Sequence, residues 1–244
     1  MRYTIFASRN AKEILRDPAT ALSGVGMPLL MLGLFTLIQS HLPLELYTLP
    51  SLTPGIAVFS FSFLSLFSAL LIAKDRSSSF LMRLFASPLT ATDYIVGYTL
   101  PLLPIAILQG IVCFVMALVL GLPANLNILL TIVVFVPIAV LYIGCGLLFG
   151  TLFTDKQVGG AFSIFVNVTT WLSGTWFALD LMGGTLRKIG YALPFAHAVD
   201  ASRAALAGDY AAIMPHLWWV LGYAVTICAV AVLAFRRRMV NGAA

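Results

Sequence analysis

The side chains that could do acid–base or nucleophilic chemistry stand at the ends of long apolar stretches rather than inside them. His41 ends the first stretch, and His197 and His216 flank the start of the last one. No acid or nucleophile is placed inside a stretch to partner these histidines, whereas a catalytic imidazole needs such a group within hydrogen-bond reach. The sequence therefore predicts no catalytic residues on this chain.

Metal and nucleotide sites are also missing from the sequence. Cys113, Cys145 and Cys228 lie within apolar stretches and have no metal-ligand spacing, so we expect free, buried thiols and no metal. The chain contains no Gly-x-x-x-x-Gly-Lys-Ser/Thr motif and no Gly-Lys pair. The backbone cradle that holds ATP phosphates is therefore not on this polypeptide.

Six apolar stretches dominate the chain, and each is long enough to cross a membrane. A hydrocarbon core of about 30 Å takes about 20 apolar residues, which must be helical because lipid offers the backbone no hydrogen-bond partners. None of the 14 basic and 9 acidic residues falls inside a stretch, and 61% hydrophobic residues exclude a soluble domain. Residues 1–244 are therefore predicted to form a single all-α, polytopic transmembrane domain. The predicted spans are Pro18–Ser40, Leu46–Ala73, Tyr94–Leu120, Asn127–Phe153, Gln157–Leu179 and Ile213–Phe235.

Basic residues predict the orientation. The gaps between spans on the side opposite the two termini hold only Arg187, Lys188 and Arg203. This bias predicts cytoplasmic termini in an inner or plasma membrane, and the scatter of the charges excludes a nucleic-acid surface. The gaps on the side of the termini hold Arg2, Arg9, Lys12, Arg16, Lys74, Arg76, Arg83, Lys156, Arg236, Arg237 and Arg238.

Two cytoplasmic segments outside the spans are amphipathic. Residues 1–17 suit an interfacial helix, either a simple anchor for the first span or a lever that also touches a cytoplasmic partner. The loop 74–93 suits a short helix over Ser77–Ala86, ended by Ser87-Pro88. That helix could sit in the groove of a partner or on the membrane surface.

Two motifs on this frame resemble the permease subunits of ABC-2 type transporters. The first joins the acidic-basic pair Asp75-Arg76, the short helix, Ser87-Pro88-Leu89-Thr90 and Ile95-Val96-Gly97-Tyr98. The second reads Leu172-Ser173-Gly174-Thr175-Trp176-Phe177 and then Ala192-Leu193-Pro194-Phe195-Ala196-His197-Ala198-Val199-Asp200-Ala201-Ser202-Arg203. The acidic residue of the first motif is commonly Glu in such proteins and is Asp75 here, which keeps the charge.

The resemblance implies a non-catalytic half-transporter that pairs with a second permease protomer, expected to be a copy of itself. Two separate ATP-binding-cassette ATPase subunits would dock underneath and carry the ATP and magnesium, leaving this chain without a cofactor. The helix in 74–93 would then be the coupling helix, with a minor contact from the loop at Asp155. The residues implied in the ATPase interface are Asp75, Arg76, Phe80, Arg83, Leu84, Phe85, Asp155 and Lys156.

Small polar residues mark one face of the fifth predicted span and a serine ladder in the second. Helix packing explains such faces as well as substrate contact does, and the resemblance favours a translocation path because spans two and five border it in similar proteins. Asn167 is the most polar side chain in mid-span. The candidate path residues are Ser62, Phe63, Ser65, Phe67, Ser163, Asn167, Thr170 and Trp171. The GxxxG at Gly146–Gly150 could serve packing within the chain or dimerisation.

The outer segment 180–212 is too apolar for a disordered loop and suggests two short helices broken at Pro194. Similar proteins bend this region back into the membrane as a re-entrant hairpin. Asp200 and Arg203 stand at i and i+3, which favours a local ion pair. A gate at the outer mouth, formed with Pro194 and His197, is the alternative.

The sequence and the resemblance together predict the permease subunit of an ATP-driven exporter. The few polar residues suit a hydrophobic or amphipathic substrate such as a drug, an antibiotic, a peptide or a lipid. A polysaccharide or glycolipid exporter, an ATP-independent carrier or channel, and a membrane scaffold or sensor stay as alternatives. An ATPase that copurifies with the chain would separate the transporter from the carrier or channel.

Overall fold

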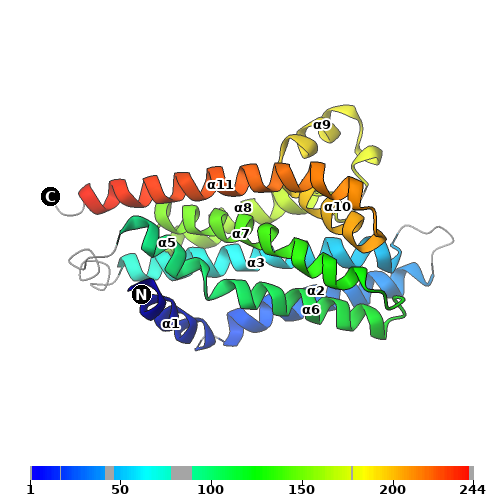
Figure 1. Cartoon of the computed structure of the whole chain (residues 1–244), viewed down its shortest axis with the longest axis horizontal. Coiled ribbons are helices and arrows are strands. Elements are labelled where there is room, and N and C mark those ends of the chain that lie inside the picture. Colours follow the sequence, from blue (N-terminus) through cyan, green and yellow to red (C-terminus); the bar gives the residue numbers. More distant parts are fainter. Residues whose placement is uncertain (1, 17, 42–46, 78–89, 177, 242–244) are drawn as a thin grey trace.

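The chain folds into an elongated bundle whose helices run roughly along one long axis (Figure 1). The structure is a computed structural model, and it describes residues 2–16, 18–41, 47–77, 90–176 and 178–241. Every regular element in these residues is helical, which confirms the all-α prediction. The elements are α1 (Arg2–Leu15), α2 (Pro18–Gln39), α3 (Leu49–Ser77), α5 (Ala91–Thr99), α6 (Leu102–Val119), α7 (Asn127–Leu152), α8 (Asp155–Leu172), the 3₁₀ turn η1 (Leu179–Met182), α9 (Gly184–Ala192), α10 (Pro194–Ala207) and α11 (Tyr210–Asn241).

Four helical segments in the described residues are long and apolar enough to cross a membrane, which makes the chain a multi-pass membrane protein. They are Leu49–Arg76, Thr92–Val119, Asn127–Leu152 and Tyr210–Arg237. The predicted first span corresponds to α2, within which Gly24–Gln39 counts as a shorter apolar helix. The fifth predicted span overlaps α8, whose charged first turn and small polar residues dilute its apolar ones.

The buried centre of the bundle is α7, against which α3, α10 and α11 pack. Residues 141–147 of α7 are buried on every side, as expected of a helix that is apolar all round. A Cβ at Gly146 would overlap the Ser65 carbonyl oxygen and the Ser68 hydroxyl of α3. The GxxxG of the fourth predicted span therefore serves close packing of α7 on α3 within one chain.

Two predicted spans differ from the helices observed. The third is divided between α5 and α6 at Leu100–Pro101, since a proline removes a helix hydrogen bond and crowds the preceding turn. The fifth was predicted to reach Leu179 but ends at Leu172, and Gly174 just beyond it has a φ of 72°. Glycine adopts that left-handed conformation readily, so the chain leaves the helix there.

The predicted break at Pro194 is confirmed, since α9 and α10 are two short helices divided there. Thr90 caps α5 through a bond from the Asp93 amide to its hydroxyl. At one end of the bundle, called here the α1 end, lie α1, the start of α5 and the last turns of α3 and α11 (Figure 1). The start of α3 and α10 lie towards the opposite, α10 end.

Candidate functional site

A buried ion pair joins α1 to α3 at the α1 end. The two Nη atoms of Arg9 donate to the two carboxylate oxygens of Asp75 at 2.6 and 2.8 Å. Asp75 is 2% exposed, whereas a third of the Arg9 side chain is exposed, so the carboxylate of this two-pronged pair is buried and the guanidinium is half-buried. Burial opposes the charge of Arg9, but the bond to Asp75 and the charges of Asp75 and Glu13 raise the pKa of Arg9 above its ordinary value.

The same carboxylate also binds α5. The Tyr98 hydroxyl donates to Asp75 at 2.9 Å, and the Asn10 amide of α1 donates to the Gly97 carbonyl at 3.0 Å. Phe6 packs edge-on against Tyr98, with ring centroids 4.9 Å apart, and a Cβ at Gly97 would overlap the Phe6 ring. Arg9, Asn10, Asp75 and Tyr98, called here the α1 latch, therefore hold three helices together.

An exposed pair borders the latch. Lys74 Nζ lies 2.8 Å from a Glu13 carboxylate oxygen, and two-thirds of the Lys74 side chain is exposed. The hydrogen bond from Lys74 lowers the pKa of Glu13. Such an exposed pair contributes little to stability compared with the buried one.

Arg76 connects α3 to the end of α7. Its Nη1 donates to the carbonyls of Gly150, Thr151 and Phe153 at 2.8, 2.5 and 3.1 Å. These carbonyls belong to the last turn of α7 and the residue after it, where a cation is favoured by the helix dipole. Asp155 and Lys156, predicted to make a minor contact with an ATPase, follow directly and are exposed on the first turn of α8.

The predicted coupling residues fall into three groups in the structure. Phe80, Arg83, Leu84 and Phe85 lie outside the described residues. Asp75 and Arg76 were predicted to orient the coupling helix, and they bind α1, α5 and α7 of their own chain. Their contact with an ATPase stays a prediction, as does that of Asp155.

The predicted path residues of α3 and those of α8 differ in burial. Ser62, Ser65 and Phe67 of α3 are buried, and the Ser62 hydroxyl lies 3.5 Å from that of Thr169 in α8. Of the two explanations for the serine ladder, the contacts within this chain favour helix packing. Phe63 and Thr170 are half-buried, whereas Ser163, Asn167 and Trp171 are exposed on one face of α8 in the described part of the chain.

At the α10 end, two histidines meet. His197 Nδ1 of α10 lies 2.8 Å from His216 Nδ1 of α11, and the His197 ring stacks on Trp219 at an interplanar angle of 3°. Desolvation lowers the pKa of His197. Tyr191 of α9 donates its hydroxyl to Asp200 at 2.9 Å. The predicted outer-gate residues Pro194, His197, Asp200 and Arg203 thus share one helix, which bridges α9, α11 and α3.

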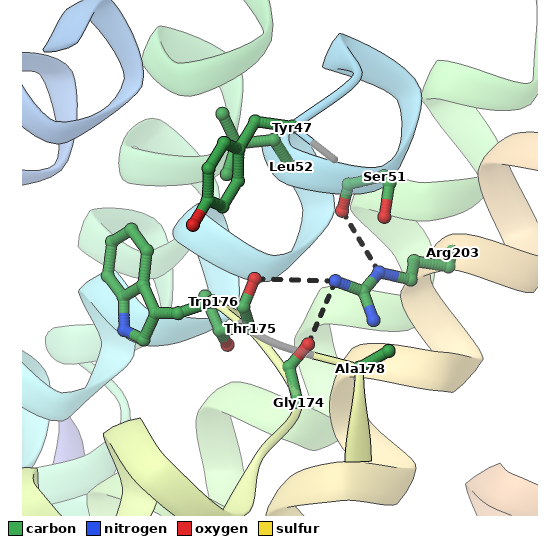
Figure 2. Close-up of a pocket in the computed structure, with 8 residues that line it drawn as sticks. All are labelled: Tyr47, Ser51, Leu52, Gly174, Thr175, Trp176, Ala178 and Arg203. Carbon is green, nitrogen blue, oxygen red and sulfur yellow. Dashed lines mark hydrogen bonds between the residues drawn. The ribbon is translucent and has the colours of Figure 1, made fainter. Parts of the chain in front are cut away.

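Arg203 makes the hydrogen bonds that join α10 to α3. Its Nε donates to the Ser51 carbonyl at 2.9 Å and its Nη2 to the Gly174 carbonyl at 3.0 Å, which ties α10 to α3 and to the segment after α8 (Figure 2). The predicted i, i+3 pair with Asp200 is present at 3.8 Å. Desolvation by burial lowers the pKa of Arg203.

Sequence reasoning missed the partners of Asp75. Arg9 and Tyr98 stand 66 and 23 positions from it, and no local spacing links residues so far apart. The one sequence signal was a charged residue, Asp75, at the very end of an apolar stretch, because such a charge is buried only when it is paired.

The comparisons agree with this picture. A search of the curated proteins finds no match. The family model of the ABC-2 type transporter matches residues 1–207, which include α1, the latch, all of α3 to α9 and α10. The chain therefore belongs to the ABC-2 type transporter family and is a multi-pass membrane permease of the ABC class.

Proposed function

We propose that this permease is the membrane subunit of an ATP-driven exporter that moves a hydrophobic or amphipathic substrate. Family members pair with ABC ATPase subunits and are themselves generally non-catalytic. In the proposed complex two copies of this chain form the path, and two ATPase subunits bind at the α1 end and hold the ATP and magnesium.

The proposed topology has six crossings, with the α1 end in the cytoplasm. α2 and α8 would be the two crossings beyond the four long apolar segments, and α9 with α10 the re-entrant outer hairpin. The basic residues support this orientation: Lys74, Arg76, Lys156 and Arg236 lie towards the α1 end, whereas Arg187 and Lys188 belong to α9.

The α1 latch is the observation that carries the proposal. Asp75 lies in the last turn of α3, immediately before the predicted coupling helix, and its carboxylate binds Arg9 and Tyr98. Because these bonds are short and largely buried, a displacement of the coupling segment would move α1, α3 and α5 as one body. A rigid-body shift of this kind transmits the work of ATP binding to membrane helices.

The open face of α8 supports the proposed path. Ser163, Asn167 and Trp171 offer small polar groups beside an exposed aromatic ring. The Asn167 amide donates one hydrogen bond to the Ser163 carbonyl one turn earlier, and its carbonyl oxygen and second N–H suit a polar group of an amphipathic substrate. An amphipathic substrate suits such a face better than a sugar or an ion.

The test is copurification of the tagged chain from its native host in a mild detergent, followed by ATPase measurements. We expect an ATPase subunit at one copy per permease, and Arg83→Glu should reduce its recovery severalfold. The matched control is Lys188→Glu, a charge reversal on the exposed surface of α9, which should leave recovery unchanged.

Recovery of the chain without an ATPase, under conditions that keep other membrane complexes intact, would favour a carrier or channel. Full ATPase recovery with Arg83→Glu would remove the coupling role assigned to that segment. An ATPase that copurifies but whose hydrolysis ignores hydrophobic and amphipathic compounds would argue against the proposed substrate class.

A further inference from the structure

A small cavity lies at the α10 end, where three separate parts of the chain meet. Its volume is about 80 Å³. The first turn of α3 forms one wall, the segment that follows α8 a second, and Arg203 of α10 a third (Figure 2). Its lining residues are Tyr47, Ser51, Leu52, Gly174, Thr175, Trp176, Ala178 and Arg203.

The charge of Arg203 is poorly compensated. Its Nε and Nη2 donate only to neutral carbonyls, those of Ser51, Gly174 and Thr175. Its one carboxylate neighbour among the described residues, Asp200, lies 3.8 Å from Nη1 and already accepts a bond from Tyr191. No hydrogen bond from Nη1 is formed within the described part of the chain. A desolvated cation in this state gains from an added anion.

The surroundings favour an anion as well. Among the described lining residues Arg203 alone is charged. The cavity borders the N-terminal turn of α3, whose dipole is positive at that end. Three backbone carbonyls hold the guanidinium in place, so it is oriented before any ligand arrives.

The other walls are aromatic. Tyr47 and Trp176 line the cavity and both pack on Phe35 of α2, with ring centroids 4.8 and 4.7 Å apart. Tyrosine and tryptophan gather at the depth of lipid headgroups. The Nη1 group of Arg203, which makes no hydrogen bond within the described residues, is the part of the guanidinium that can donate a charge-assisted hydrogen bond to a phosphate oxygen.

We propose that this cavity binds a phosphate oxyanion, supplied by a lipid headgroup or by a free phosphate, through Arg203. The site is separate from the α1 end and from the open face of α8. Binding at it does not depend on ATP or on transport, so it can fail or succeed independently of the proposed export.

Calorimetric titration of the purified full chain in a phosphate-free, non-ionic detergent tests the proposal. Three probes are used: dioctanoyl phosphatidic acid, dioctanoylglycerol, which differs only in lacking the phosphate, and inorganic phosphate alone. We expect phosphatidic acid to bind at least about tenfold more tightly than dioctanoylglycerol. Inorganic phosphate binding as tightly as phosphatidic acid would identify a free anion as the ligand, and weaker binding would identify the headgroup.

Two variants locate the binding. Arg203→Gln should weaken phosphatidic acid about tenfold or more, although it also removes bonds that connect three elements. Ala178→Phe leaves Arg203 untouched and fills the cavity from an exposed position, so it should weaken binding to a similar extent. Ala211→Phe, on an exposed position of α11 outside the cavity, should bind as the unchanged chain does.

Equal affinity for phosphatidic acid and dioctanoylglycerol would overturn the proposal. So would unchanged phosphate affinity in a correctly folded Ala178→Phe chain.

Discussion

Arg9 of α1 and Asp75 of α3 stand 66 positions apart in the chain and form a two-pronged ion pair with donor–acceptor distances of 2.6 and 2.8 Å. With Phe6 and Asn10, this pair makes α1 a packed element of the bundle. The buried side of α1 contacts α5 and α3, so α1 is more than a positive anchor for the first span. A contact of residues 1–17 with a cytoplasmic partner, the lever interpretation, stays a prediction.

Asp75→Asn should lower the free energy of unfolding by about 2 kcal/mol, because the Arg9 guanidinium, whose side chain is one-third exposed, loses two charge-assisted hydrogen bonds to a buried carboxylate. The measurement is unfolding by SDS titration in mixed micelles. Lys74→Gln, which breaks the exposed pair with Glu13, should cost only about 0–1 kcal/mol. If the two variants lost the same free energy of unfolding, the Arg9–Asp75 pair would contribute no more to stability than the exposed Lys74–Glu13 pair.

Gly146→Ala should be destabilising by about 1–3 kcal/mol, since the added methyl group has no room against the α3 backbone at Ser65. Gly222→Ala is the matched control because a Cβ there meets nothing within 4 Å. It should be neutral or stabilising by up to about 1 kcal/mol. Thermal unfolding of both variants in the same detergent compares them, and a tolerated Gly146→Ala would contradict the close packing of α7 on α3.

Acidification should destabilise the α10 end. Desolvation lowers the pKa of His197, so the unfolded chain binds a proton more readily than the folded one. The neutral imidazole's contribution is present above the ordinary pKa of about 6.5 and is lost as the pH falls from there through the folded value. We expect a lower unfolding temperature at pH 5 than at pH 7.5.

His197→Gln should reduce that pH dependence while Asp200 and His216 stay in place. The comparison is the difference in unfolding temperature between the two pH values, variant against unchanged chain. A variant that kept the full difference would assign the effect to another group.

The orientation can be tested with a membrane-impermeant maleimide on intact cells. Lys188→Cys, on the exposed surface of α9, should be labelled from outside. Lys156→Cys, exposed on the first turn of α8, should be labelled only after the membrane is opened. The native Cys113 and Cys145 are buried and should give little background, and the reverse labelling pattern would invert the proposed topology.

Much of the fold could be predicted because the relevant signals are local. Length and apolarity predict helices, since a backbone in lipid must bond within its own segment. Pro194 as a break acts on its immediate neighbours, and that break is confirmed. The differences are also local: the chain turns at Leu100–Pro101 within the third predicted span, and Gly174 ended α8 earlier than its apolar pattern suggested.

The partners of the polar side chains required the three-dimensional arrangement. Composition and charge established the membrane class, the absence of a phosphate cradle and the side on which basic residues gather, because those properties depend on residue type and order. Three features depend on helices brought together from distant parts of the chain. Asp75 binds Arg9, Arg76 binds the end of α7, and Arg203 borders a cavity. A side chain's burial and charge partners follow from that packing, and no spacing along the sequence encodes them.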